Sequence, residues 1–100
     1  MIFYIILEEG DLMYKLLIVE DDFIIAKGLQ KHFEKYHYDV QYIEDFEHVL
    51  DEFLEFQPDL VLLDIHLPFF DGYYWCQEIR KISQIPIVFI SSANANMNIV

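Results

Sequence analysis

Two apolar runs in this chain end in acidic residues, and these acids are the side chains best suited to do chemistry. Residues 16–19 are followed by Glu20, Asp21 and Asp22, and residues 60–63 are followed by Asp64. If both runs are buried parallel strands, their acids meet at the carboxyl edge of the sheet, where open α/β sheets bind ligands. Converging carboxylates repel one another, so such a site requires a proton or a cation. Asp64 is therefore the candidate chemical centre.

Composition narrows the classes of protein that can contain such a site. The 100 residues suffice for one domain, and 55% of them are hydrophobic, which is enough for a packed core. The net charge is −12, from 18 acidic and 6 basic residues. This balance disfavours direct binding to nucleic acid or to an anionic membrane, because both need basic patches.

The cellular compartment is predicted from the single cysteine and from the apolar segments. Cys76 has no partner for an internal disulfide, which is compatible with a reducing cytoplasm. No apolar stretch is long enough to span a bilayer, and residues 1–7 lack the basic start and cleavage site of a signal peptide. We expect a cytoplasmic protein.

The elements that must position the acids follow from the periodicity of the apolar residues. Strands are predicted at residues 15–19, 40–43, 60–63 and 85–90. A first helix, capped by Asp21 or Asp22, is predicted from apolar residues at helical spacing, namely Ile25, Leu29, Phe33 and Tyr36. Asp45 is expected to cap a second helix, whose apolar face comprises Phe46, Val49, Leu50, Phe53 and Leu54. A third helix is predicted at residues 72–81, and residues 93–100 are expected to begin a fourth.

This alternation of strands and helices predicts an α/β fold with a parallel sheet covered on both faces. Right-handed crossovers favour a doubly wound, flavodoxin-like sheet in which the first and third strands are neighbours. That adjacency is what would bring Asp21 close to Asp64.

With these motifs in order, the chain resembles the receiver domain of bacterial two-component response regulators, which has the CheY-like form of this fold. The resemblance covers residues 13–100 and depends on four segments, namely residues 16–22, residues 58–64, Leu67-Pro68 with Asp71-Gly72, and residues 85–91. Within the family the chain is most similar to the OmpR-like branch of DNA-binding regulators. Its last residues resemble regulators of bacitracin and cationic-peptide resistance.

The resemblance implies a role for each site residue. Asp64 would accept a phosphoryl group from a sensor histidine kinase, and Ser91 would hydrogen-bond that group and move with it. Mg²⁺ would bind to Asp64, to Asp21, to Glu20 through water and to the backbone carbonyl of His66. Phosphorylation would then switch a DNA-binding output domain that lies outside this sequence. The domain would act as a switch, with at most self-phosphorylation and self-dephosphorylation, rather than as a conventional enzyme.

The chain departs from the family pattern at both ends. Residues 13–100 are expected to form an incomplete receiver, with strand order 2-1-3-4-(5), truncated before the fifth strand and its phosphoryl-contacting lysine. Such a sheet exposes its fourth strand, so we expect either poor phosphorylation or self-association, as a homodimer or a strand-exchanged oligomer. Residues 1–12 precede the family match, and we expect them to be a non-native extension created by a mis-annotated start. The competing interpretation is an extra strand at residues 2–7.

Three interpretations remain open for individual residues and for the whole chain. Asp22 is equally compatible with a helix cap and with a site acid. A degenerate interaction module without phosphotransfer is the alternative function. An aspartate-nucleophile phosphatase is a weaker one, because such enzymes carry a second acid two residues after the nucleophile and His66 occupies that position.

Overall fold

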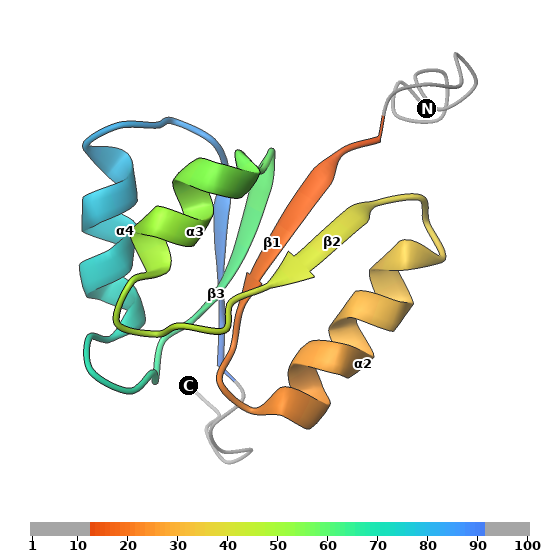
Figure 1. Ribbon diagram of the computed structural model, residues 1–100, viewed down its shortest axis with the longest axis horizontal. Helices are drawn as coiled ribbons and strands as arrows, with labels where there is room; N and C mark the ends of the chain where they lie inside the picture. Colours follow the sequence, from red (N-terminus) through yellow and green to blue (C-terminus); the bar gives the residue numbers. More distant parts are fainter. Residues whose placement is uncertain (1–12, 92–100) are drawn as a thin grey trace.

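The computed structural model describes residues 13–91, which form a single parallel sheet with helices on both faces (Figure 1). The elements are β1 (Lys15–Val19), α2 (Phe23–Glu34), β2 (Asp39–Tyr42), α3 (Val49–Phe56), β3 (Leu60–Asp64), α4 (Gly72–Arg80) and β4 (Ile87–Ile90). The predicted alternation of strands and helices is confirmed. The expected extension at residues 1–12 and the helix expected from residue 93 lie outside the described residues.

The sheet has the strand order β2-β1-β3-β4, and all of its pairs are parallel. The first and third strands of the chain are therefore neighbours, which confirms the flavodoxin-like arrangement. In their register, Val19 lies opposite Leu63 and Ile18 opposite Leu62. β1 ends at Val19, opposite Leu63, and β3 ends one residue later at Asp64, so Glu20 and Asp64 lie at the same edge of the sheet.

Alternate residues of β1 face the two sides of the sheet, as the pleat requires. Leu16 and Ile18 pack with Ala26 of α2, whereas Leu17 and Val19 pack with residues of α3 and α4. Figure 1 shows α3 and α4 on one side of the sheet and α2 on the other. All four apolar residues of β1 are at most 1% exposed, so the strand is anchored from both faces.

Local hydrogen bonds decide where the helices begin, and they correct one prediction. Asp22 caps α2, because its Oδ1 accepts the N–H groups of Ile24 and Ile25 at 3.0 and 3.2 Å. Asp45 does not cap α3, contrary to the prediction; that helix begins after His48, which makes no side-chain capping bond. The Asp45 side chain instead accepts the N–H of Glu47, two residues on, which stabilises a turn in place of a helical start.

The outer surfaces of the helices correct the predicted apolar faces at two positions. Leu54 is 50% exposed, so it lies outside the core to which Val49 and Phe53 belong. The first helix ends at Glu34, before Tyr36, which is 54% exposed. In residues 13–91, no helix is both long enough and apolar enough to cross a membrane.

Candidate functional site

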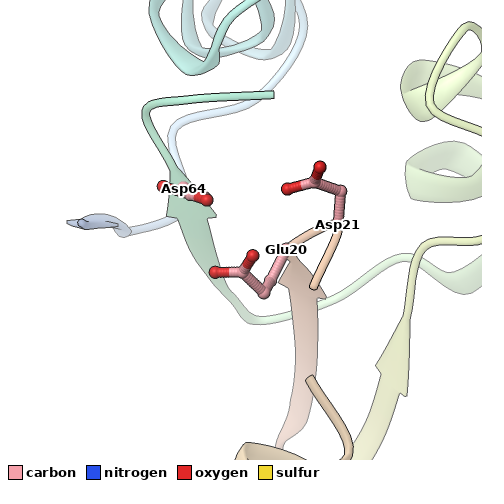
Figure 2. A group of neighbouring side chains, drawn as sticks. All are labelled: Glu20, Asp21 and Asp64. Carbon is pink, nitrogen blue, oxygen red and sulfur yellow. The ribbon is translucent and has the colours of Figure 1, made fainter. Parts of the chain in front are cut away.

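The acids that follow β1 and the acid that ends β3 form one group, here called the sheet-edge cluster: Glu20, Asp21 and Asp64. Glu20 directly follows Val19, and Asp64 directly follows Leu63, the two residues paired across β1 and β3. One carboxylate oxygen from each of the three residues lies within 4.8 Å of the others. In Figure 2 the Glu20 and Asp21 carboxylates turn toward the end of β3. The predicted meeting of Asp21 and Asp64 is thus present.

Burial distinguishes the members of the sheet-edge cluster. Glu20 is 2% exposed and Asp64 is 1% exposed, whereas Asp21 is open to solvent. Charged side chains are rarely buried to this extent unless they are paired or bind a metal. The cluster therefore combines two buried carboxylates with one that is accessible from outside.

Each buried carboxylate is oriented by a backbone group two residues further along the chain. The Asp22 N–H donates to Glu20 Oε2 at 2.9 Å, and the His66 N–H donates to Asp64 Oδ1 at 3.2 Å. Asp22 itself belongs to the α2 cap and lies outside the sheet-edge cluster. The two interpretations of Asp22 are thereby resolved in favour of the helix cap.

The end of β4 places Ser91 at the same edge of the sheet. Asp64 is paired with Ile90, and the Ile65 N–H donates to the Ile90 carbonyl oxygen at 3.2 Å. Ser91 follows Ile90 and is exposed, and the His66 side chain is exposed as well. The predicted roles of the Ser91 hydroxyl and of the His66 carbonyl stay predictions.

A shallow pocket of about 230 Å³ opens beside Glu20 and Asp21. Its remaining lining is largely apolar and comes from α2, β2 and the segment after β2: Phe23, Ala26, Tyr42, Ile43, Glu44 and Phe46. The Phe23 and Tyr42 rings meet edge to face, with centroids 5.8 Å apart. The accessible side of the sheet-edge cluster therefore borders an apolar surface.

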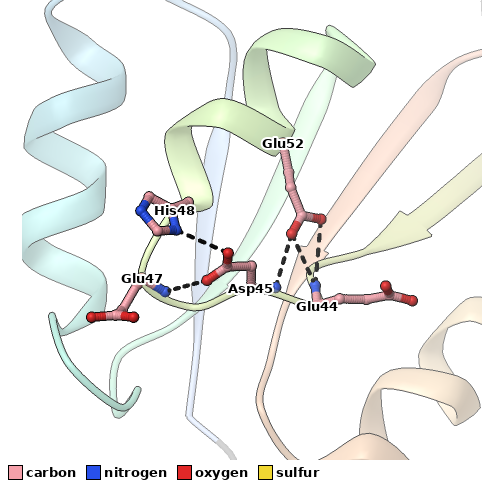
Figure 3. Close-up of polar contacts among 5 residues, drawn as sticks. All are labelled: Glu44, Asp45, Glu47, His48 and Glu52. Atoms are coloured by element: carbon pink, nitrogen blue, oxygen red, sulfur yellow. Dashed lines mark hydrogen bonds and ion pairs between the residues drawn. The ribbon is translucent and has the colours of Figure 1, made fainter.

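A second acidic group, which the sequence did not single out, lies in the segment between β2 and α3 and at the start of α3. We call it the loop cluster: Glu44, Asp45, Glu47, His48 and Glu52 (Figure 3). Glu52 Oε2 accepts the N–H of Asp45 at 2.8 Å and that of Glu44 at 3.3 Å. Asp45 Oδ2 lies 2.9 Å from His48 Nδ1. Spacing along the chain does suggest the Asp45–His48 contact, which joins residues three apart.

The Asp45–His48 pair shifts the titration of both partners. The hydrogen bond to His48, together with the Glu47 N–H, lowers the pKa of Asp45 below its ordinary value. The hydrogen bond and charge of Asp45 raise the pKa of His48. Both side chains are more than half exposed, so solvent screens the pair.

Comparison with known families decides the class of protein. Residues 16–100 match the response regulator receiver domain family. The chain belongs to this family. The receiver domain is a module of two-component signalling, and the strand order β2-β1-β3-β4 agrees with that assignment.

Two relatives of this receiver domain are transcriptional or response regulators of Gram-positive bacteria. The chain is 54% identical over 86 residues to the uncharacterized transcriptional regulatory protein YvcP of Bacillus subtilis. These residues make up 86% of the chain and 36% of YvcP. It is 43% identical over 84 residues to the response regulator protein GraR of Staphylococcus aureus, covering 84% of the chain and 38% of GraR. The receiver domain thus spans little more than a third of these relatives, whose descriptions agree with the OmpR-like branch.

Two solved structures share the fold of this receiver domain. The N-terminal domain of the nisin resistance regulator NsrR is 46% identical, with a TM-score of 0.75 over 87% of this chain and 74% of that one. The BeF3-activated receiver domain of Klebsiella pneumoniae RstA is 33% identical, with a TM-score of 0.75 over 82% and 70% of the two chains. The similarity therefore extends from the motifs to the whole arrangement of the elements.

Proposed function

We propose that this receiver domain accepts a phosphoryl group on Asp64 from the phosphohistidine of a sensor histidine kinase. The observation that carries the proposal is the convergence of three carboxylates at the end of β1 and β3, with Asp64 almost fully buried. An acid with only a solvated surface role would not need to be buried beside two other carboxylates. A carboxylate at the carboxyl edge of a parallel sheet can act as a nucleophile and form an acyl phosphate.

The donor set of the sheet-edge cluster fits Mg²⁺. All three side chains offer carboxylate oxygens, the ligands that Mg²⁺ prefers together with water and phosphate. Asp21 and Asp64 would hold the ion directly, Glu20 would act through water, and the His66 carbonyl would supply a further oxygen. When bound, the ion neutralises negative charge on the phosphoryl oxygens.

The side chains of the chain itself perform the remaining tasks. An Asp64 carboxylate oxygen attacks the phosphorus, a new P–O bond forms, and the P–N bond of the phosphohistidine breaks, leaving the electron pair on the imidazole. The His66 N–H donates to Asp64 Oδ1 and so fixes the orientation of the attacking carboxylate. The Ser91 hydroxyl donates to a phosphoryl oxygen, so that the segment after β4 responds to the modification.

In the whole protein, this switch would control a DNA-binding output domain in the cytoplasm, as expected for a transcriptional regulator of the OmpR-like branch. The likeness to a nisin resistance regulator supports a role in the response to peptide antibiotics. Turnover would be limited to self-phosphorylation and self-dephosphorylation at Asp64. Direct contact of this domain with nucleic acid is disfavoured by its net charge of −12.

The test is phosphorylation by a small phosphodonor, phosphoramidate, in the presence of Mg²⁺. We expect a hydroxylamine-sensitive acyl phosphate in low yield on the wild-type chain, and a further loss of about 100-fold or more for Asp64→Asn, which removes the nucleophile. Glu52→Gln, an acid of the loop cluster, is the matched control and should be labelled normally. Label that persists in Asp64→Asn would refute the site, and a wild-type chain that takes no label would favour an interaction module.

We also propose that this chain associates with itself through β4. Within the described residues β4 pairs on one side, with β3, and its Val88 and Phe89 are 47% and 38% exposed. An apolar strand at the edge of a sheet is a template for pairing with a second chain. We expect concentration-dependent oligomers in sedimentation, shifted to monomer by Val88→Lys and unaffected by Lys27→Glu on α2. A wild-type monomer at all concentrations would contradict this expectation.

A further inference from the structure

Gly72, the first residue of α4, lies directly against the backbone of Asp64. A methyl group built on its Cα would overlap the Asp64 carbonyl oxygen and lie 3.0 Å from the Asp64 carbonyl carbon and from Ile65 Cα. These are backbone atoms at the end of a central strand, so they cannot swing aside as a flexible side chain would. Gly72 does not have a left-handed backbone, so the position requires glycine for space rather than for conformation.

Hydrogen bonds hold α4 in this close approach. The Gly72 N–H donates to the Ile65 carbonyl oxygen at 2.9 Å, which closes the loop between β3 and α4. Asp71 caps the helix, since its Oδ1 accepts the Tyr74 N–H at 2.9 Å. On its other side, Ile65 is bonded to Ile90 of β4. The residue after Asp64 is therefore fixed between α4 and β4.

The same short segment determines how the Asp64 carboxylate points. The His66 N–H, which donates to Asp64 Oδ1, is separated from Asp64 by Ile65 alone. An atom added at Gly72 must displace the Asp64 and Ile65 backbone, because neither the strand nor the helix leaves room for it. That displacement moves the carboxylate and the N–H that orients it.

We propose that Gly72 is a positioning residue for Asp64, one that acts by bringing the N-terminus of α4 into contact with the backbone of the acceptor. The inference rests on the proposed function, since it assigns Gly72 to the same site. It also gives the Asp71-Gly72 pair a defined role: Asp71 secures the first turn of α4, and Gly72 permits its contact with Asp64.

The chain offers two controls that separate positioning from stability. Gly28 lies in α2, and a methyl group added there meets no atom within 4 Å, so Gly28→Ala makes the same chemical change without a clash. Ile79 lies on α4 itself, is fully buried and belongs to the core. Ile79→Val loosens the packing of the same helix without touching the Asp64 backbone.

The experiment measures the Mg²⁺ dissociation constant of the full 100-residue chain by titration calorimetry, at a temperature where every variant is folded. For Gly72→Ala we expect an increase of about 10- to 100-fold, the range found when residues that orient metal ligands are changed. Gly28→Ala and Ile79→Val should stay within about twofold of wild type, because neither alters a ligand. An unchanged constant in folded Gly72→Ala would overturn the proposal.

A second pair of variants keeps the test decisive if Gly72→Ala does not fold. Asp71→Asn and Asp71→Ala remove the same charge, but only asparagine can still cap α4. Positioning by the first turn of α4 predicts weaker Mg²⁺ binding for Asp71→Ala than for Asp71→Asn. Equal dissociation constants for these two variants would refute it.

A magnetic resonance readout separates this inference from the proposed function. If the wild-type chain binds no Mg²⁺, the proposed function loses its metal, but positioning is still measurable without one. The Asp64 carboxyl ¹³C and His66 amide resonances should then shift in Gly72→Ala, or in Asp71→Ala relative to Asp71→Asn, and not in Gly28→Ala. Resonances that stay in place in both tests would overturn the positioning role.

Discussion

The sheet-edge cluster and the loop cluster are both rich in carboxylates, yet the surroundings of these carboxylates differ. In the loop cluster, Glu52 and Asp45 accept backbone N–H groups of their own segment, and Asp45 has His48 beside it. Glu44 and Glu47 direct their carboxylates away from these bonds (Figure 3). In the sheet-edge cluster, oxygens from three carboxylates converge, and two of the side chains are buried.

This difference teaches that the number of acids does not identify a site. Exposed carboxylates bonded to nearby N–H groups stabilise a turn and are screened by water. Buried carboxylates that face one another raise the free energy of the fold unless a cation or a proton joins them. Convergence of buried carboxylates at the end of two strands is therefore the stronger sign of function, and the clusters should respond differently to Mg²⁺ and to mutation.

The largest effect should be stabilisation by Mg²⁺. At a concentration about 100 times the dissociation constant, binding raises the free energy of unfolding by about 2.7 kcal/mol. Asp64→Asn should lose most of this gain because a ligand is missing, whereas Glu52→Gln should retain it. Chemical denaturation with and without Mg²⁺ measures both gains. A full gain in Asp64→Asn combined with its loss in Glu52→Gln would reverse the roles of the two clusters.

An intermediate effect is expected from the structural acid of the loop cluster. Glu52→Ala removes the carboxylate that accepts the N–H groups of Glu44 and Asp45 and should lower the free energy of unfolding by about 1–2 kcal/mol. Glu55→Ala, an exposed site on the same helix, should change it by less than about 0.5 kcal/mol. Denaturant titration measures the free energy of unfolding of both variants. An equal decrease in the two would show that the hydrogen bonds from the Glu44 and Asp45 N–H groups to Glu52 do not contribute to stability. Mg²⁺ affinity should not change in either variant.

The smallest effect is a pH dependence from His48. Asp45 raises the pKa of His48 above its ordinary 6.5. The contribution of the Asp45–His48 pair to the free energy of unfolding is therefore complete below pH 6.5, and it is lost as the pH rises through the higher pKa of the folded state. The pKa of Asp45 is lowered, so Asp45 stays charged throughout this window. The destabilisation by His48→Gln should therefore be larger near pH 5.5 than near pH 8.5. A larger loss at the higher pH would contradict the assigned pair.

The sequence predicted the elements well where a single physical signal dominated. The apolar runs of β1 and β3 are recognisable because strands buried on both faces are continuously hydrophobic. Prediction failed at Asp45, where a helix cap and a turn compete for the same side chain, and the turn prevails. At Leu54 the helical spacing was correct, but within residues 13–91 half of that side chain stays exposed.

The candidate site was predictable in its residues and in the meeting of Asp21 and Asp64, but not in its detailed geometry. Glu20, Asp21 and Asp64 follow apolar runs, which marks them from the sequence alone. The distinction between Asp22 as cap and Asp21 as site acid required the observed helix start. The steric demand at Gly72 could not be anticipated, because it arises from the docking of α4 against a strand that ends eight positions earlier in the chain.

The sequence by itself determined the order of the elements, their apolar faces and the acids that end the strands, since these depend on periodicity within short segments. Only the tertiary structure decided that two carboxylates are buried beside a third and that Gly72 contacts the acceptor backbone. The reason is physical: convergence of side chains depends on which segments become neighbours and how closely they pack. The sequence already marks Asp64 as the candidate chemical centre, and the fold adds its burial and the two carboxylates beside it.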